Sequence, residues 1–138
     1  MKIEYQGDKI IIYLYRYKIN LNNLEKLNED VKNVFIKLIK TYRLNLFGYS
    51  KVHLYENKKY GIIFEIEKVY QGDFLKEIID LKLLLHEDAT FYLEMESYPL
   101  DKKNDDIFYQ NGKFYWNIEK IDNLLKYLEL GRIIYDKK

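Results

Sequence analysis

Residues 9–17, Lys-Ile-Ile-Ile-Tyr-Leu-Tyr-Arg-Tyr, decide how the first half of this chain folds. Successive side chains of a strand point to opposite faces of a sheet. One face of this stretch is therefore aliphatic (Ile10, Ile12, Leu14) and the other is mainly tyrosine (Ile11, Tyr13, Tyr15, Tyr17). Neither face has the polar character of a solvated one. The pattern predicts a strand inside a sheet that is covered, at least in part, on both sides.

Turn residues divide the neighbouring strand patterns into hairpins. Gln6-Gly7-Asp8 separates residues 2–5 from residues 9–17, and its glycine permits a positive φ. Residues 51–55 and 60–68 flank Glu56-Asn57-Lys58-Lys59 and form a second predicted hairpin.

Two further hairpins are predicted in the second half. Residues 79–85 and 90–97 alternate around the turn His86-Glu87-Asp88-Ala89, although residues 74–81 also suit a brief helical turn. Residues 107–109 and 113–118 flank Gln110-Asn111-Gly112, where Asn-Gly is a strong signal for a two-residue turn.

One long amphipathic helix is predicted over residues 22–43. Its apolar residues recur at steps of three and four: Leu24, Leu27, Val31, Val34, Phe35, Leu38, Ile39 and Tyr42. Asn22 or Asn23 can cap its start. Acidic residues lie early and basic residues late, which complements the helix dipole. We expect its apolar stripe to pack on the aliphatic face of residues 9–17.

A short C-terminal helix is predicted over residues 121–130, with Leu124, Leu125 and Leu128 facing inward and Gly131 ending it. Residues 132–135 suit a closing strand. The whole predicts an α+β fold: a mostly antiparallel sheet of about seven strands built from hairpins, one long amphipathic helix and one short C-terminal helix. We expect a single α+β domain over residues 1–138.

Composition excludes several functional classes. The chain has 48% hydrophobic and 33% charged residues, as an ordinary globular protein has. Its net charge of +1 argues against a nucleic-acid partner, and the absence of cysteine excludes disulfides, thiolate metal sites and a cysteine nucleophile. The N-terminus does not resemble a signal peptide, and no apolar run has the length of a membrane span. We expect a cytoplasmic protein without a cofactor or a membrane, and the Lys-, Ile-, Asn- and Tyr-rich composition suits an AT-rich bacterial genome or its mobile elements.

Tyrosine is the most unusual component, with 15 of 138 residues. Tyrosine combines a large apolar ring with a polar tip and is enriched at protein interfaces. The sequence therefore predicts a non-enzymatic protein-binding domain with a tyrosine-rich sheet face for a protein partner or a second copy in a homodimer. The predicted binding residues are Tyr13, Tyr15, Tyr17, Tyr109 and Tyr115. The alternative is that these rings simply cover a sheet.

Carboxylate pairs carry a rival hypothesis. Glu65 and Glu67 share one face of their strand, and Glu94 and Glu96 share a face of theirs. If the two strands were neighbours, four carboxylates would converge and could serve a small metal-dependent enzyme; otherwise they form a solvated polar face. His53 and His86 stand in no spaced ligand motif and are interpreted as surface histidines, so we assign no catalytic or metal-binding residue.

Basic residues around the end of the long helix and the first internal hairpin suit a weak nucleic-acid-binding domain, with tyrosines to stack on bases. The members are Lys37, Lys40, Arg43, Lys51, Lys58 and Lys59. Helix-dipole complementation already accounts for the first three.

The order of elements resembles that of MecA-type adaptors, which deliver substrates to the Clp protease machinery of low-GC bacteria. The likeness lies in a strand ending near Tyr17, a helix with an acidic start, and the pair 51–54 and 61–68. It extends to residues 107–116, Ile-Phe-Tyr-Gln-Asn-Gly-Lys-Phe-Tyr-Trp, followed by a helix and Gly131-Arg132-Ile133-Ile134. The resemblance implies an adaptor role and transfers no functional residues.

Overall fold

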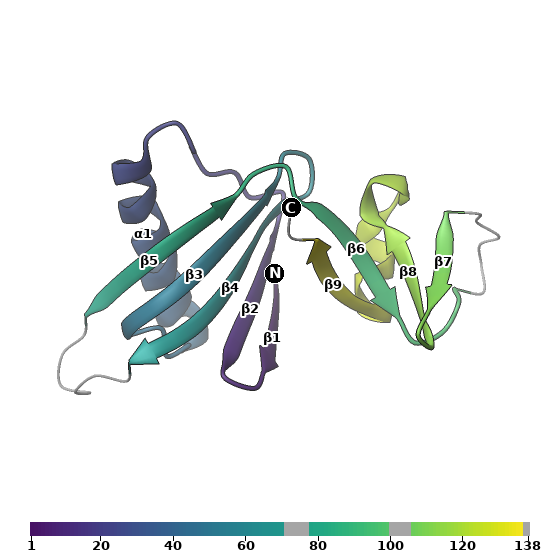
Figure 1. The fold of residues 1–138 in the computed structure, drawn as a ribbon, viewed down its shortest axis with the longest axis horizontal. Coiled ribbons are helices and arrows are strands. Elements are labelled where there is room, and N and C mark those ends of the chain that lie inside the picture. Colours follow the sequence, from purple (N-terminus) through teal and green to yellow (C-terminus); the bar gives the residue numbers. More distant parts are fainter. Residues whose placement is uncertain (71–77, 100–105, 137–138) are drawn as a thin grey trace. The chain divides into compact units, whose positions relative to one another are not determined.

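A computed structural model describes residues 1–70, 78–99 and 106–136. The described residues form an α+β fold with nine strands in two sheets, together with α-helices α1 and α2 (Figure 1). The chain divides into two compact units, Met1–His86 and Glu87–Lys138. The α+β class is thus confirmed. The single sheet of about seven strands is wrong, because the strands separate into a five-stranded and a four-stranded sheet. The prediction of one domain over residues 1–138 stays a prediction.

The first unit is built on a five-stranded sheet in the order β1-β2-β4-β3-β5. Its strands are β1 (Lys2–Gln6), β2 (Lys9–Tyr15), β3 (Gly48–Asn57), β4 (Gly61–Tyr70) and β5 (Ile79–His86). The predicted hairpins β1–β2 and β3–β4 are both present and antiparallel. β2 pairs with β1 on one side and with β4 on the other, which places residues 9–15 inside the sheet, as predicted.

Helix α1 spans Leu24–Tyr42, close to the predicted residues 22–43. Asn23 is the N-cap, and its side-chain oxygen accepts hydrogen bonds from the backbone amides of Glu25 and Lys26. Arg43 ends the helix in the left-handed conformation with φ of 55°, and its amide donates to the Ile39 carbonyl. The predicted cap is therefore confirmed. The predicted apolar stripe is buried from Leu27 to Leu38, whereas Leu24 and Tyr42 at its two ends are exposed.

The core of the first unit lies between α1 and one face of the sheet. Ile12 of β2, Phe64 of β4 and Leu54 of β3 lie on this face and are fully buried. Leu27 and Phe35 of α1 are buried against them, and the rings of Phe35 and Phe64 meet edge-on with centroids 5.5 Å apart. The aliphatic face of residues 9–17 thus packs under the helix, as predicted.

The second unit contains a four-stranded antiparallel sheet in the order β7-β8-β6-β9. Its strands are β6 (Thr90–Met95), β7 (Ile107–Gln110), β8 (Lys113–Asn117) and β9 (Gly131–Asp136). The β7–β8 hairpin is the predicted one. Its turn residues Asn111 and Gly112 both have positive φ, as a two-residue turn of this kind requires.

The predicted C-terminal helix over residues 121–130 is broken into short pieces. A 3-10 turn η1 (Ile118–Lys120) precedes the four-residue helix α2 (Leu124–Tyr127), and a second 3-10 turn η2 (Leu128–Leu130) follows it. Among the three predicted inward leucines, Leu124 is buried, Leu128 is half-buried and Leu125 is exposed.

Tyr127 points inward in this segment instead. Its ring packs on Trp116, the only tryptophan of the chain, with centroids 5.0 Å apart, and both side chains are buried.

Gly131 directly follows η2, where the sequence predicts the helical segment to end, and its backbone is extended. It begins β9 opposite Met95, where any β-carbon would overlap the carbonyl oxygen of Glu94. Its role is therefore to allow close approach of two strands. The predicted closing strand after it is confirmed.

The predicted hairpin of residues 79–85 with 90–97 is wrong. β5 pairs in parallel with β3, whereas β6 lies in the second sheet. The leucine run 83–85 has apolar residues at both alternating positions, so it suits a strand that is half-buried on both faces. Sequence spacing alone could not distinguish a parallel return to β3 from a local hairpin.

No helix of the described ranges is long and apolar enough to cross a membrane.

We predict that Gly61→Ala destabilises the protein far more than Gly7→Ala. Gly61 has φ of +112° and a β-carbon there would overlap the Leu14 carbonyl oxygen of the neighbouring strand. Gly7 has φ of +60° and open space around it, so alanine there costs only about 1–2 kcal/mol. Urea unfolding of both variants measures the difference. Equal losses of unfolding free energy would contradict this account of the β2–β4 contact.

Candidate functional site

The face of the first sheet opposite α1 carries tyrosine, histidine and glutamate side chains, and we call it the tyrosine face. β2 contributes Ile11, Tyr13 and Tyr15 by strand alternation. The registers bring Ile63 and Glu65 of β4, His53 and Tyr55 of β3, and Leu84 and His86 of β5 to the same side.

Tyr13 belongs to the core rather than to the surface. Its side chain is 3% exposed, and its hydroxyl donates a hydrogen bond of 2.7 Å to the backbone carbonyl of Tyr60. Burial, followed by the proximity of Tyr15 and Tyr60, raises the pKa of its hydroxyl. At this position the structure fits the alternative in which the ring simply covers the sheet.

Tyr15 and Tyr17 lie progressively further out. Tyr15 is half-buried, and the Arg16 guanidinium lies 5.1 Å from its ring centroid. Arg16 has φ of 56° and donates its amide to the Tyr60 carbonyl, which turns the chain out of β2. Tyr17 is consequently 38% exposed, beyond the end of the strand.

A hollow of about 240 Å³ adjoins Tyr17. Its lining mixes apolar, amide and charged side chains: Tyr17, Lys18, Ile19, Glu56, Asn57 and Lys58. Asn57 is part of this lining, and its side-chain oxygen accepts hydrogen bonds from the amides of Lys59 and Tyr60, which fixes the β3–β4 turn. We call this feature the Tyr17 hollow.

Tyr109 and Tyr115 lie in the second unit, on opposite faces of its sheet. The β7–β8 register pairs Tyr109 with Phe114 and Tyr115 with Phe108, and paired residues of antiparallel strands share a face. Tyr109 is 64% exposed, whereas Tyr115 stacks on Phe108 with centroids 5.4 Å apart. The two tyrosines therefore cannot form one surface patch with each other.

The two histidines, interpreted from sequence as surface residues outside any spaced ligand motif, meet on the tyrosine face. His53 Nδ1 and His86 Nε2 are 2.8 Å apart, a hydrogen-bond distance between side chains 33 positions apart in the chain. Their rings lie nearly parallel, and the His86 ring stacks on Tyr55 with centroids 4.5 Å apart. The parallel pairing of β3 and β5, which aligns Tyr55 with His86, creates this contact. From the sequence, this contact could have been predicted only by pairing residues 79–86 with residues 48–55 in the correct parallel register.

Glu65 is a buried carboxylate beside this aromatic stack. Lys9 Nζ lies 3.0 Å from its Oε1, and the Tyr55 hydroxyl donates to its Oε2 at 3.4 Å. The hydrogen bond and charge of Glu65 raise the pKa of Lys9. Burial, followed by the Glu65 charge, raises the pKa of Tyr55. Glu65 therefore serves as the acceptor of a structural network.

The condition for the four-carboxylate hypothesis is not met. Glu65 and Glu67 lie on β4 of the first sheet, whereas Glu94 and Glu96 lie on β6 of the second, so the strands are not neighbours. Among the described residues there is also no group of three or more histidine, aspartate or glutamate side chains arranged to hold a metal ion.

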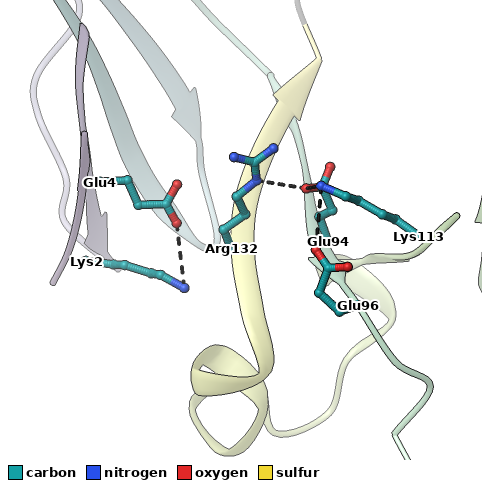
Figure 2. Close-up of polar contacts among 6 residues, drawn as sticks. All are labelled: Lys2, Glu4, Glu94, Glu96, Lys113 and Arg132. Carbon is teal, nitrogen blue, oxygen red and sulfur yellow. Dashed lines mark hydrogen bonds and ion pairs between the residues drawn. The ribbon is translucent and has the colours of Figure 1, made fainter. Parts of the chain in front are cut away.

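Glu94 is instead the centre of an ion-pair cluster in the second unit (Figure 2). Its Oε1 lies 2.8 Å from Arg132 Nε of β9 and 3.2 Å from Lys113 Nζ of β8, and Lys113 also reaches Glu96 at 3.6 Å. Burial alone would raise the pKa of Glu94, but hydrogen bonds from Lys113, Arg132 and Tyr115 together lower it. Figure 2 also shows the Lys2–Glu4 pair of β1, with atoms 3.8 Å apart.

The basic residues proposed for nucleic acid do not form one patch. Arg43 ends α1 just before β3, whereas Lys58 and Lys59 lie in the turn after it. The ten residues of β3 span roughly 30 Å. Lys51 lies on the tyrosine face opposite Glu67 of β4. The cations are thus spread along the sheet, and the electrostatic footprint that nucleic-acid binding needs is weak.

Comparison with protein-family models, with curated proteins and with solved structures found no match. The MecA-type resemblance therefore stays a prediction.

We predict that the histidine pair contributes measurably to stability through its hydrogen bond. His53→Phe and His86→Phe retain an aromatic ring at each position but remove one partner. A neutral hydrogen bond contributes about 0.5–1.5 kcal/mol. The double-mutant cycle, measured by urea unfolding, should therefore show a coupling energy of this size. Additive losses would mean that the two rings act independently.

The lowered pKa of Glu94 predicts how the stability of the protein depends on pH. The folded pKa of Glu94 is lowered, so its contribution to stability is present above the ordinary glutamate pKa of about 4.3 and is lost as pH falls through the folded value. Glu94→Gln should therefore be less stable than wild type at pH 7, and the gap should close in acid. Glu96→Gln is the matched control, because the Glu96 side chain is largely exposed. Urea unfolding between pH 7 and pH 3 measures both, and a gap that does not change with pH would contradict the assignment.

Proposed function

We propose that this chain is a non-enzymatic protein-binding domain whose contact surface includes the Tyr17 hollow. One observation supports this most directly: Tyr17, alone among the predicted tyrosines of residues 9–17, is more than one-third exposed and borders a hollow. Large amphipathic side chains at the edge of a depression are typical anchors of protein interfaces.

The surroundings of the Tyr17 hollow suit a protein partner. Ile19 supplies apolar surface, and Asn57, whose side chain fixes the β3–β4 turn, also lines the depression. Lys18, Lys58 and Glu56 give the lining charges of both signs, which suits a polypeptide of mixed charge better than a polyanion. Tyr13 supports this surface from within the core, since its hydroxyl bonds Tyr60 just after the same turn.

The rival functions have less support. Glu65 and Glu94 are each engaged by cations and lie in different sheets, so a metal-dependent enzyme lacks its site among the described residues. The dispersed cations and the net charge of +1 offer little to nucleic acid. A protein-binding role is also what the MecA-type resemblance implies, and delivery of a bound protein to a protease is the form that role would take.

We predict that Tyr17→Ala weakens partner binding while leaving the fold intact. Replacing Tyr17 by a photo-crosslinking amino acid in cells of the source organism should identify the partner as a discrete adduct. With that partner purified, Tyr17→Ala should weaken its affinity at least about tenfold, as truncation of an interface anchor does.

Tyr5 provides the matched control. It is 68% exposed on β1 but lies away from the Tyr17 hollow, so Tyr5→Ala should bind normally. Tyr13→Ala is unsuitable as a test of binding, because loss of this buried ring would destabilise the core by about 3–5 kcal/mol. A Tyr17→Ala variant that remains folded and retains wild-type affinity would disprove the proposal.

A further inference from the structure

The edge strand β5 is the second surface whose chemistry suggests a partner. Among the described strands it pairs on one side only, in parallel with β3, and it lies at the outer edge of the sheet (Figure 1). An apolar strand with a free row of backbone donors and acceptors is a template for another strand. β5 has this character, because five of its eight residues are leucine or isoleucine.

Two charged residues interrupt the apolar residues of this strand. Asp80 and Lys82 are both exposed and share the face opposite α1. Lys82 is aligned with Lys51 of β3, so it has a like charge as its neighbour within the sheet. A carboxylate on the open side of β5 would offset this repulsion.

We propose that a second copy of this chain pairs with β5 in antiparallel orientation about a two-fold axis at Leu81. In this register Asp80 of each copy lies opposite Lys82 of the other, and symmetry produces the pair twice. Ile79 lies opposite Leu83 on the side of α1. Opposite charges and apolar side chains in direct cross-strand positions both stabilise antiparallel pairing.

Other symmetric registers lack this complementarity. An axis at Asp80 or at Lys82 places that residue opposite its own copy, so like charges face each other. An axis at Leu83 places Asp80 opposite His86 and Lys82 opposite Leu84. The charge pattern therefore selects Leu81.

A groove beside β5 supports the same partner independently. It has a volume of about 590 Å³ between α1 and the start of β5, and Ile36, Ile39, Phe47 and Ile79 form its apolar lining. Ile36 is 39% exposed there. A two-fold axis perpendicular to a sheet keeps both helices on the same face, so α1 of the second copy approaches this groove and covers Ile36.

The experiment is a charge swap read by sedimentation equilibrium of the full chain. Wild type should form a reversible dimer. Asp80→Lys and Lys82→Asp should each weaken the dimer at least about tenfold, because each turns two attractive pairs into repulsive ones. The double variant Asp80→Lys/Lys82→Asp should recover the dimer, and an equimolar mixture of the two single variants should form a heterodimer.

Asp8→Lys, in the exposed β1–β2 turn, is the control and should dimerise normally. Circular dichroism verifies that every variant is folded. A monomeric wild type overturns the proposal, and so does a dimer that neither single variant weakens or that the double variant fails to restore. If the wild type is monomeric and Asp80→Lys abolishes its binding to a different protein, β5 binds that protein instead of a second copy. The β5 surface is separate from the Tyr17 hollow, so failure of one proposal leaves the other intact.

Discussion

Contact between Phe35 of α1 and Phe64 of β4 joins the helix to the middle of the first sheet. The distribution of side chains between the two faces of this sheet follows from that contact. Once Phe64 faces the helix, alternation along β4 directs Ile63 and Glu65 to the opposite face, and the register directs Tyr13 and Tyr55 there as well. This sheet also buries aromatic rings on the face opposite the helix, and the hydroxyls of Tyr13 and Tyr55 find backbone and carboxylate partners there.

Two buried carboxylates among the described residues are each held by neighbouring side chains. Glu65 is held by Lys9 and Tyr55, and Glu94 by Arg132 and Lys113. Hydrogen bonds from Lys113, Arg132 and Tyr115 hold the pKa of Glu94 below its ordinary value, so this carboxylate is poorly placed to accept a proton from a substrate near neutral pH.

Sequence patterns predicted the elements that depend on residues close together in the chain. The helical period and Asn23 cap located α1, and Gly7 and Asn111-Gly112 located two turns, because each signal lies within a few residues of the structure it produces. Partners distant in sequence were not predictable in this way. The parallel return of β5 to β3, and with it the His53–His86 contact, depends on a choice between two strand partners that leucines 83–85 do not distinguish. The assignment of Tyr109 and Tyr115 to one surface failed for a related reason, since only the β7–β8 register shows that they face opposite ways.

The burial of Trp116 against Tyr127 has a practical consequence for studying this molecule. It is the only tryptophan of the chain and lies wholly within the second unit, whereas helix α1 belongs to the first. Tryptophan emission therefore reports on the environment of the second unit alone, while helical ellipticity is dominated by the first. The two optical signals give each unit its own probe without any labelling, and their coincidence or separation on heating reveals whether the units melt as one cooperative body.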